Sequence, residues 1–371
     1  MDFNIKLVVL LFVCFQAIHS SEGKKKPATL NVLTFNVALH ESEQFAIGTR
    51  EPRKRKIIRA LKKSDADLIC LQEVFIGEDV EAIVNNLKEQ FPYSYSEMHT
   101  AVNKLPPQAK KKTSPPCDYA NLSAYIACVK NSTCYPLNIS CITTTCTPEV
   151  ENLFRFEDQG CFTCIAESMW NVEACGAEKP IIGGRQVNNG GLILLSKKKL
   201  YRTSFKDYHP TTRESYFRGY IKTKIRNFAD VRCTHLKSTN FPYFFEPELQ
   251  AIGFNSLEEV HTHQTKALIK SLKKKRPAII LGDINTGLAF KPKLMARIPE
   301  NYIALLKQFT TRPANRYTYK DWTDESNKSI TDHVFVRDLI IRKTKRLYIP
   351  KDGKLQMSDH VGVQSVVKRA C

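Results

Sequence analysis

Four short polar clusters, placed where apolar runs end, constrain the fold of this chain more than any other feature. They are Gln72-Glu73-Val74, Thr234-His235-Leu236, Gly282-Asp283-Ile284-Asn285 and Ser358-Asp359-His360. The apolar runs before the first three clusters are typical of buried strands. Acidic, amide and imidazole side chains are costly to bury unless they bind a cation or a substrate. If these strands lie in packed sheets, their ends meet at one rim, and the clusters share one cleft.

Apolar periodicity predicts that strands and helices alternate along the chain. An amphipathic helix is predicted over Asp79 to Gln90, a second helix over Arg53 to Lys63, and a long, interrupted helical region over Pro247 to Lys273. The predicted strands are Leu30 to Val37, Asp67 to Leu71, Gly191 to Ser196, Tyr220 to Ile225, Val231 to His235, Ala278 to Leu281, Ile330 to Val336 and Val361 to Val367. The consecutive strands between residues 191 and 235 favour a mainly antiparallel sheet.

The first 20 residues are typical of a secretory signal peptide. Lys6 precedes the apolar stretch Leu7 to Phe15, and small and polar residues follow around Ser20. The apolar stretch is too short for a membrane span, which takes about 20 such residues. We therefore expect residues 1–20 to be removed and the mature protein to be secreted as a monomer.

Most cysteines lie in one segment, residues 106–180, which we call the cysteine-rich insertion. It contains eight of the twelve: Cys117, Cys128, Cys134, Cys141, Cys146, Cys161, Cys164 and Cys175. An even number of clustered cysteines in a secreted chain predicts disulfides, with zinc binding at Cys161-x-x-Cys164 as the alternative. Glycosylation sequons begin at Asn121, Asn131 and Asn138. We expect one catalytic domain, residues 28–371, that is interrupted by this insertion.

Cys70 and Cys233 lie outside the insertion, each in a predicted buried strand. Apolar neighbours raise the pKa of a thiol, so neither cysteine is expected to be a nucleophile. Cys371 could pair with one of the cysteines outside the insertion.

The net charge of +19 indicates a basic surface that suits an anionic partner, either nucleic acid or an acidic membrane. Taken singly, each basic run is more simply a solvated loop or helix face. The runs are Lys24 to Lys26, Arg53 to Lys56, Lys110 to Lys112, Lys197 to Lys199, Lys273 to Arg276 and Arg342 to Arg346.

The strand ends offer oxygen ligands for a hard divalent cation. Asn36 and Glu73 each end a predicted strand, and magnesium prefers one or two carboxylates together with water and phosphate oxygens. Asp283 and Asn285 alternate across a strand end, so both can face the cleft and hold a water and a phosphate oxygen, while Ile284 turns into the core. An Asx turn closed by Gly287 is the alternative.

Two Asp-His pairs differ in their predicted roles. His360 follows Asp359 and could act as a general base if Asp332, on a neighbouring strand, holds its other ring nitrogen. His235 ends its strand and could donate to a phosphoryl oxygen or to the leaving group. His333, beside Asp332, is interpreted as structural.

His261 and His263 are two residues apart on a predicted helix, so they lie on different faces and do not suggest a shared metal site.

Together these residues resemble the endonuclease/exonuclease/phosphatase superfamily. The matching positions are Asn36, Gln72-Glu73-Val74, Gly190-Gly191-Leu192 leading to Leu195-Ser196-Lys197, His235, Gly282-Asp283-Ile284-Asn285, Asp332-His333 and Ser358-Asp359-His360. The resemblance implies a four-layer α/β sandwich of two facing, mainly antiparallel sheets flanked by helices, here with a disulfide-rich insertion. It also implies hydrolysis of a phosphoester that depends on Mg²⁺, with Mn²⁺ or Co²⁺ as substitutes.

Three further segments resemble secreted neutral sphingomyelinases more than deoxyribonucleases: the runs that begin at Asn188, Phe217 and Cys233. By this resemblance Glu73 binds the metal with Asn36 nearby. His360, which follows Asp359, is the general base oriented by Asp332. Asp283 and Asn285 position water and phosphate, and His235 serves the leaving group. The chain departs from the family at Ile284, where Phe is commoner, and in its cysteine-rich insertion.

The sequence thus predicts a phosphoric diester hydrolase that converts sphingomyelin to ceramide and phosphocholine at a membrane surface. An aromatic run containing Phe241, Tyr243, Phe244 and Phe245 could dip into the membrane, although packing of these rings into the core is the more common arrangement. The alternatives are a secreted DNase-like nuclease on the same scaffold and a non-catalytic adhesion module built on the insertion.

Overall fold

The structure is a computed structural model. It describes residues 28–39, 49–97, 117–132, 145–156, 161, 164–165, 172–176, 187–188, 190–208, 218–239, 253–287, 299–320, 328–349 and 356–369. The predicted signal peptide, the aromatic run Phe241 to Phe245 and Cys371 lie outside these residues.

The first sheet has six strands in the order β13-β14-β1-β2-β4-β3. Neighbouring strands are antiparallel except for β1 and β2, which are parallel. The strands are β1 (Thr29–Asn36), β2 (Leu68–Gln72), β3 (Tyr93–Ser96), β4 (Ile193–Ser196), β13 (Leu339–Leu347) and β14 (Gly362–Arg369).

The second sheet also has six strands, in the order β5-β6-β7-β8-β12-β9. Here β7 and β8 are the parallel neighbours, and the other pairs are antiparallel. The strands are β5 (Leu200–Asp207), β6 (Gly219–Ile225), β7 (Ala229–His235), β8 (Ala278–Asp283), β9 (Thr310–Thr311) and β12 (Asp332–Arg337). A short separate hairpin joins β10 (Tyr319–Lys320) to β11 (Lys328–Ser329).

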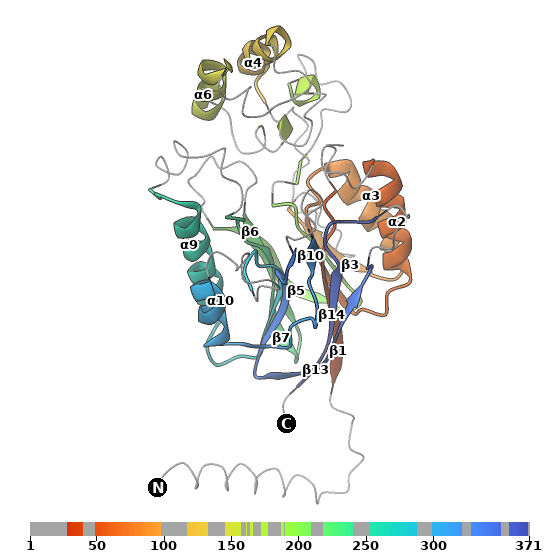
Figure 1. The fold of residues 1–371 in the computed structure, drawn as a ribbon. Coiled ribbons are helices and arrows are strands. Elements are labelled where there is room, and N and C mark those ends of the chain that lie inside the picture. Colours follow the sequence, from red (N-terminus) through yellow and green to blue (C-terminus); the bar gives the residue numbers. More distant parts are fainter. Residues whose placement is uncertain are drawn as a thin grey trace, which may run out of the picture.

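The two sheets face each other, and helices cover their outer faces (Figure 1). One apolar core lies between the sheets and draws on both. Helices α2 (Arg50–Lys62) and α3 (Gly77–Leu87) pack on the first sheet, and α9 (Leu257–Lys270) and α10 (Pro299–Leu306) pack on the second. In α3, Val80, Ile83, Val84 and Leu87 are all buried, as their helical spacing predicts. The predicted four-layer sandwich is confirmed.

A disulfide joins the two sheets across this core. Cys70 of β2 is bonded to Cys233 of β7, and both side chains are fully buried. Neither cysteine therefore has a free thiol, which agrees with the prediction that neither is a nucleophile.

The described part of the cysteine-rich insertion is helical and stands apart from the sandwich (Figure 1). It contains α4 (Tyr119–Asn131), α6 (Thr147–Phe156) and the short 3-10 helix η2 (Val172–Cys175). Disulfides link Cys117 to Cys161, Cys128 to Cys146 and Cys164 to Cys175. Because Cys161 and Cys164 are each bonded to another cysteine, the zinc alternative is wrong.

Two basic runs are not the solvated loops or helix faces that the sequence favoured. In α2, Arg53 and Lys54 are buried against the protein. Arg342 to Arg346 lie in β13, an edge strand of the first sheet. Charged side chains are common on edge strands because they discourage pairing with another chain.

None of the described helices is long and apolar enough to cross a membrane.

Candidate active site

The polar clusters converge at one rim of the sandwich, as predicted. In the first sheet β1 ends at Asn36 and Glu73 follows β2, while in the second β7 ends at His235 and β8 at Asp283. The Nδ2 of Asn36 donates to Glu73 Oε1 at 2.8 Å and to Asp283 Oδ2 at 3.1 Å. One amide therefore joins carboxylates from both sheets.

Glu73 lies on a backbone turn that contacts with residues 187–192 of the same chain hold in place. Its φ of 59° lies in the left-handed region, which is costly for a residue with a side chain and is found where surrounding contacts enforce it. Asn188, which follows the insertion, donates from its side chain to Val74 O at 2.9 Å and to Leu192 O at 3.2 Å. The backbone of Val187 also bridges to Ile76. The segment that follows the insertion is thus anchored to the loop that carries Glu73.

The two oxygens of Asp283 have different partners. Oδ1 accepts from the backbone N of Asn285 at 2.9 Å, which is an Asx turn, and Oδ2 faces Asn36 and the site histidines. Asn285 has a φ of 51°, so it reaches the site through a left-handed turn and not through the strand alternation that the sequence suggested. Ile284 is buried as predicted. Gly282 is required because a Cβ there would lie 2.1 Å from Thr234 O of β7.

His360 and Asp332 form a buried pair that crosses between the sheets. Nδ1 of His360 donates to Asp332 Oδ2 at 2.8 Å, so the carboxylate orients the ring. Nε2 then faces the cleft, 3.7 Å from Asp283 Oδ2 and 3.5 Å from Asn36 Nδ2. Burial by itself lowers the pKa of His360, but Asp332, Asp283 and Asp359 together raise it well above its usual range. The geometry is that of a general base held by a carboxylate.

His235 lies opposite, also buried. Its Nε2 is 3.5 Å from Asp283 Oδ2, 3.9 Å from Glu73 Oε1 and 3.0 Å from Asn285 Nδ2. Its Nδ1 is 3.1 Å from the guanidinium of Arg218. Burial, and to a smaller extent the positive charge of Arg218, lowers the pKa of His235 to about 3, so this imidazole is neutral.

Asp359 directly precedes His360 in the chain and lies beside this pair. The hydroxyl of Ser358 donates to Asn36 O at 2.7 Å and accepts from His360 N at 3.0 Å, and Oδ1 of Asp359 lies 3.2 Å from the same hydroxyl oxygen. Ser358 therefore ties the end of β1 to the segment that carries His360. Asp359 contributes charge to His360 from a half-buried position.

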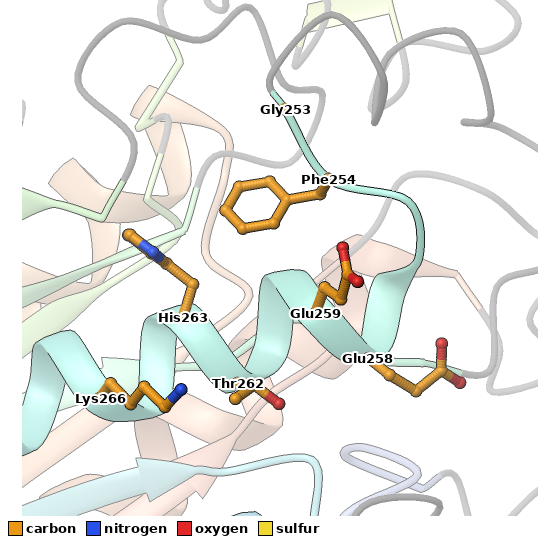
Figure 2. A pocket seen from close by; sticks show the side chains of 7 residues that line it. All are labelled: Gly253, Phe254, Glu258, Glu259, Thr262, His263 and Lys266. Carbon is orange, nitrogen blue, oxygen red and sulfur yellow. The ribbon is translucent and has the colours of Figure 1, made fainter.

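Among the residues that the structure describes, the other three histidines do not face this cleft. His333 is buried with its Nε2 3.0 Å from Ile330 O and 3.1 Å from Thr286 O, and burial lowers its pKa to about 4. His261 is buried with its Nε2 2.8 Å from Ile284 O. His263 is exposed and lines an open pocket at the start of α9, where it meets the ring of Phe254 edge-on (Figure 2). The predicted structural role of His333 agrees with these contacts.

Three residues that the sequence interpretation did not assign to the site support it. Arg218 contacts His235 as described. Arg53, buried under the rim, donates to Val37 O at 3.4 Å and to Met357 O at 3.2 Å, so it holds the loops that carry Asn36 and His360. The ring of Tyr319 lies 5.0 Å from that of His360. Of these three residues, only Arg218 had a sequence signal, because it lies in the run beginning at Phe217 that resembles secreted neutral sphingomyelinases.

The donor set fits a hard divalent cation. Glu73 and Asp283 direct carboxylate oxygens at the same amide nitrogen, and Asp332 Oδ1 is buried without a hydrogen-bond partner. Among the described residues, Asp283, Asp332 and His360 also bring ligand atoms within 4.8 Å of one another. Carboxylates concentrated in this way favour a bound cation.

Comparisons with known proteins agree with this arrangement. Residues 28–360 match the model of the Endonuclease/Exonuclease/phosphatase family. No curated protein sequence matches the chain.

Several solved structures are similar to this one. An endonuclease/exonuclease/phosphatase from Beutenbergia cavernae is 13% identical, with 92% of this chain and 72% of that chain covered and a TM-score of 0.51. One from Bacteroides vulgatus is 12% identical, with 92% and 100% covered and a TM-score of 0.50. Sphingomyelinase C from Streptomyces griseocarneus is 14% identical, with 92% and 100% covered and a TM-score of 0.48. Identities this low concern the fold and do not assign a substrate.

Proposed function

The chain belongs to the Endonuclease/Exonuclease/phosphatase family of hydrolases that act on phosphodiester bonds, and on this basis we propose that it is a secreted, Mg²⁺-dependent sphingomyelin phosphodiesterase. It would release phosphocholine and ceramide. The observation that carries the proposal is the His360–Asp332 pair facing Glu73, Asp283 and His235 across one rim.

In the proposed reaction a water attacks phosphorus in line with the bond to the ceramide oxygen. Nε2 of His360 faces the cleft and takes the proton from that water, while Asp332 holds the ring and stabilises its positive charge. Asn285 and Asp283 hold the water and a phosphate oxygen, and His235 faces the leaving oxygen. The bond between phosphorus and the ceramide oxygen then breaks.

Glu73 is the residue that we propose as the main Mg²⁺ ligand, with Asp283 beside it. A bound divalent cation would offset the negative charge that develops on the phosphoryl and leaving oxygens. A site made of Asp283, Asp332 and His360 would have to replace the hydrogen bond that orients His360, so we do not favour it. Asn36 Oδ1 accepts from Ala38 N at 3.1 Å while its Nδ2 faces the carboxylates, so in this structure Asn36 orients Glu73, and direct ligation would need the amide to turn over.

The substrate class rests on the sequence. The runs beginning at Asn188, Phe217 and Cys233 resemble secreted neutral sphingomyelinases, and the signal-like segment together with four described disulfides supports export. Asn121, Asn131 and Asn138 would then be open to glycosylation. The basic surface and the aromatic run Phe241 to Phe245 suit peripheral contact with an anionic membrane, although that run lies outside the described residues.

A secreted nuclease on the same scaffold is the second candidate, because a net charge of +19 also favours nucleic acid. The two candidates share the chemistry and differ in what the surface binds. A non-catalytic adhesion module would need none of the buried pairing between His360 and Asp332.

A comparison of two substrates tests the proposal. The secreted protein, with Mg²⁺, is given sphingomyelin vesicles in one reaction and DNA or RNA in another, and phosphocholine release is compared with nucleic acid cleavage. We expect phosphocholine release, lowered about a hundredfold or more by His360→Ala. Nucleic acid cleavage that is lost in the same variant, without phosphocholine release, would establish the nuclease instead. Cell binding that survives Glu73→Ala with His360→Ala, with neither activity in the wild type, would support the adhesion module.

A further inference from the structure

Arg218 occupies an unusual position for a buried cation. It immediately precedes β6, which runs antiparallel to β7, and β7 ends at His235. Its side chain is buried, with the residue 8% exposed, and one guanidinium nitrogen lies 3.1 Å from Nδ1 of His235. The contact follows from the register of the two strands, because Tyr220 pairs with Thr234.

This contact fixes where the proton of His235 lies. A guanidinium has only N–H donors, so Nδ1 of His235 must accept and carries no hydrogen. A neutral imidazole has a single N–H, which is therefore on Nε2. That nitrogen faces two acceptors, Asp283 Oδ2 at 3.5 Å and Glu73 Oε1 at 3.9 Å, which suits a donor.

A second donor competes for the same ring. Nδ2 of Asn285 lies 3.0 Å from Nε2 of His235, but it also donates to Leu236 O at 2.8 Å. A neutral imidazole has one lone pair and can satisfy only one of the two donors. The charged guanidinium makes the stronger hydrogen bond, and Asn285 keeps its carbonyl partner.

In His360 the ring nitrogen that carries the hydrogen is Nδ1, the opposite of His235. The Nδ1 of His360 donates to the carboxylate of Asp332, so in the neutral form, in which it acts as a base, its Nε2 presents a lone pair to the cleft. The two site histidines thus have partners of opposite charge and opposite hydrogen positions.

We propose that Arg218 is a positioning residue that holds His235 in the Nε2–H form, so that His235 donates a hydrogen bond to the phosphoryl or leaving oxygen and transfers no proton. The role in catalysis rests on the proposed phosphodiesterase function, whereas the hydrogen position does not. His360 alone then moves a proton. The ceramide oxygen takes its proton from a water molecule, and the hydroxide left behind is neutralised by the proton that His360 returns.

Nuclear magnetic resonance of the full secreted protein with ¹⁵N-labelled histidine tests the hydrogen position directly. Two-bond ¹H–¹⁵N correlations distinguish Nδ1–H from Nε2–H, and His235→Gln identifies the signal of His235 by its loss. We expect Nε2–H for His235 in the wild type and in Arg218→Lys, and loss of that preference in Arg218→Met. The Nδ1–H of His360 serves as an internal control that Arg218→Met leaves unchanged. Nδ1–H for His235 in the wild type, or an unchanged signal in Arg218→Met, would overturn the proposal, and the wild-type spectrum decides even if the Met variant does not fold.

Turnover of sphingomyelin vesicles tests the role. Glutamine can place an amide N–H where histidine has Nε2–H, but it cannot carry a proton. We expect His235→Gln to stay within about tenfold of wild-type kcat and His235→Ala to lose about a hundredfold, whereas His360→Gln should be as poor as His360→Ala. Arg218→Lys should restore most of the kcat that Arg218→Met loses. If His235→Gln is as inactive as His235→Ala in a folded protein, His235 transfers a proton and the proposal fails. If the wild type does not cleave sphingomyelin, the proposed function fails, and the spectra still decide the hydrogen position.

Discussion

Among the disulfides that the structure describes, removal of the one between the sheets should lower the free energy of unfolding most. Cys70 and Cys233 are 163 residues apart, and a cross-link that closes a loop of this length stabilises the folded state by about 5 kcal/mol in the chain-entropy description. The disulfides of the insertion shorten the effective loop, but the dependence is logarithmic, so the value changes little. We therefore expect Cys70→Ala with Cys233→Ala to lower the free energy of unfolding by about 5 kcal/mol.

The matched control is the pair Cys164 and Cys175. These cysteines are also fully buried, but they are only 11 residues apart, which corresponds to about 3 kcal/mol in the same description. Replacing either pair by alanine removes the same atoms from a buried position, so the loss of packing is similar. Urea unfolding followed by circular dichroism gives both values from the midpoint and slope.

The double variant at Cys70 and Cys233 must unfold at lower urea than the double variant at Cys164 and Cys175. Equal midpoints, or the reverse order, would show that closure of the long loop does not set the stability of the sandwich. Turnover measured below both transitions adds a second readout, because Glu73 and His235 lie just beyond the two bonded cysteines and should lose their alignment.

Three further substitutions test the site. Glu73→Gln should raise the Mg²⁺ concentration needed for activity, and added Mg²⁺ should restore part of the rate, as a Mg²⁺ titration measures. Asp332→Asn removes a carboxylate that raises the pKa of His360; since the base must be unprotonated, the rising limb of kcat/KM against pH should move to lower pH while the maximum falls about a hundredfold or more. A limb that stays in place would mean that Asp332 does not set this pKa. Gly282→Ala should destabilise the fold by on the order of 3 kcal/mol, seen in thermal unfolding, because the new Cβ would meet Thr234 O; an unchanged midpoint would refute this.

The sequence predicted those site residues that directly follow an apolar run typical of a buried strand. Asn36, Glu73, His235 and Asp283 all follow apolar runs, so their meeting at one rim needed only the assumption of packed sheets. The pairing of His360 with Asp332 was also accessible, because an imidazole base needs a carboxylate partner.

Elements without a clear apolar pattern were harder to predict. The edge strand β13 contains Leu339 and Ile341 but then runs through Arg342 to Arg346, so its charges concealed a strand. Edge strands are half solvated and do not need regular alternation, and β5 on the edge of the second sheet is similar.

The partner of a side chain depends on register, which the sequence does not display. Nothing near Arg218 in the chain indicates His235, and nothing near Cys70 indicates Cys233. Both contacts arise from the pairing of β6 with β7 and from the facing of β2 and β7 across the core. For the same reason the sequence suggested that Asn285 faces the site by strand alternation, when a left-handed turn brings it there.

The principal contacts of the site cross from one sheet to the other. Asn36 of the first sheet holds Asp283 of the second, and His360, on the segment before β14, is oriented by Asp332 at the start of β12. Neither sheet alone contains a base with its orienting carboxylate, so the chemistry depends on the spacing between the sheets. That spacing is set by the apolar core between them and by one disulfide placed just behind the rim. A close-packed core resists small displacements of one sheet against the other. The hydrogen bonds of 2.8 to 3.1 Å between the sheets would be weakened by such displacements. We therefore expect changes in the core beneath the rim to reduce turnover before they unfold the protein.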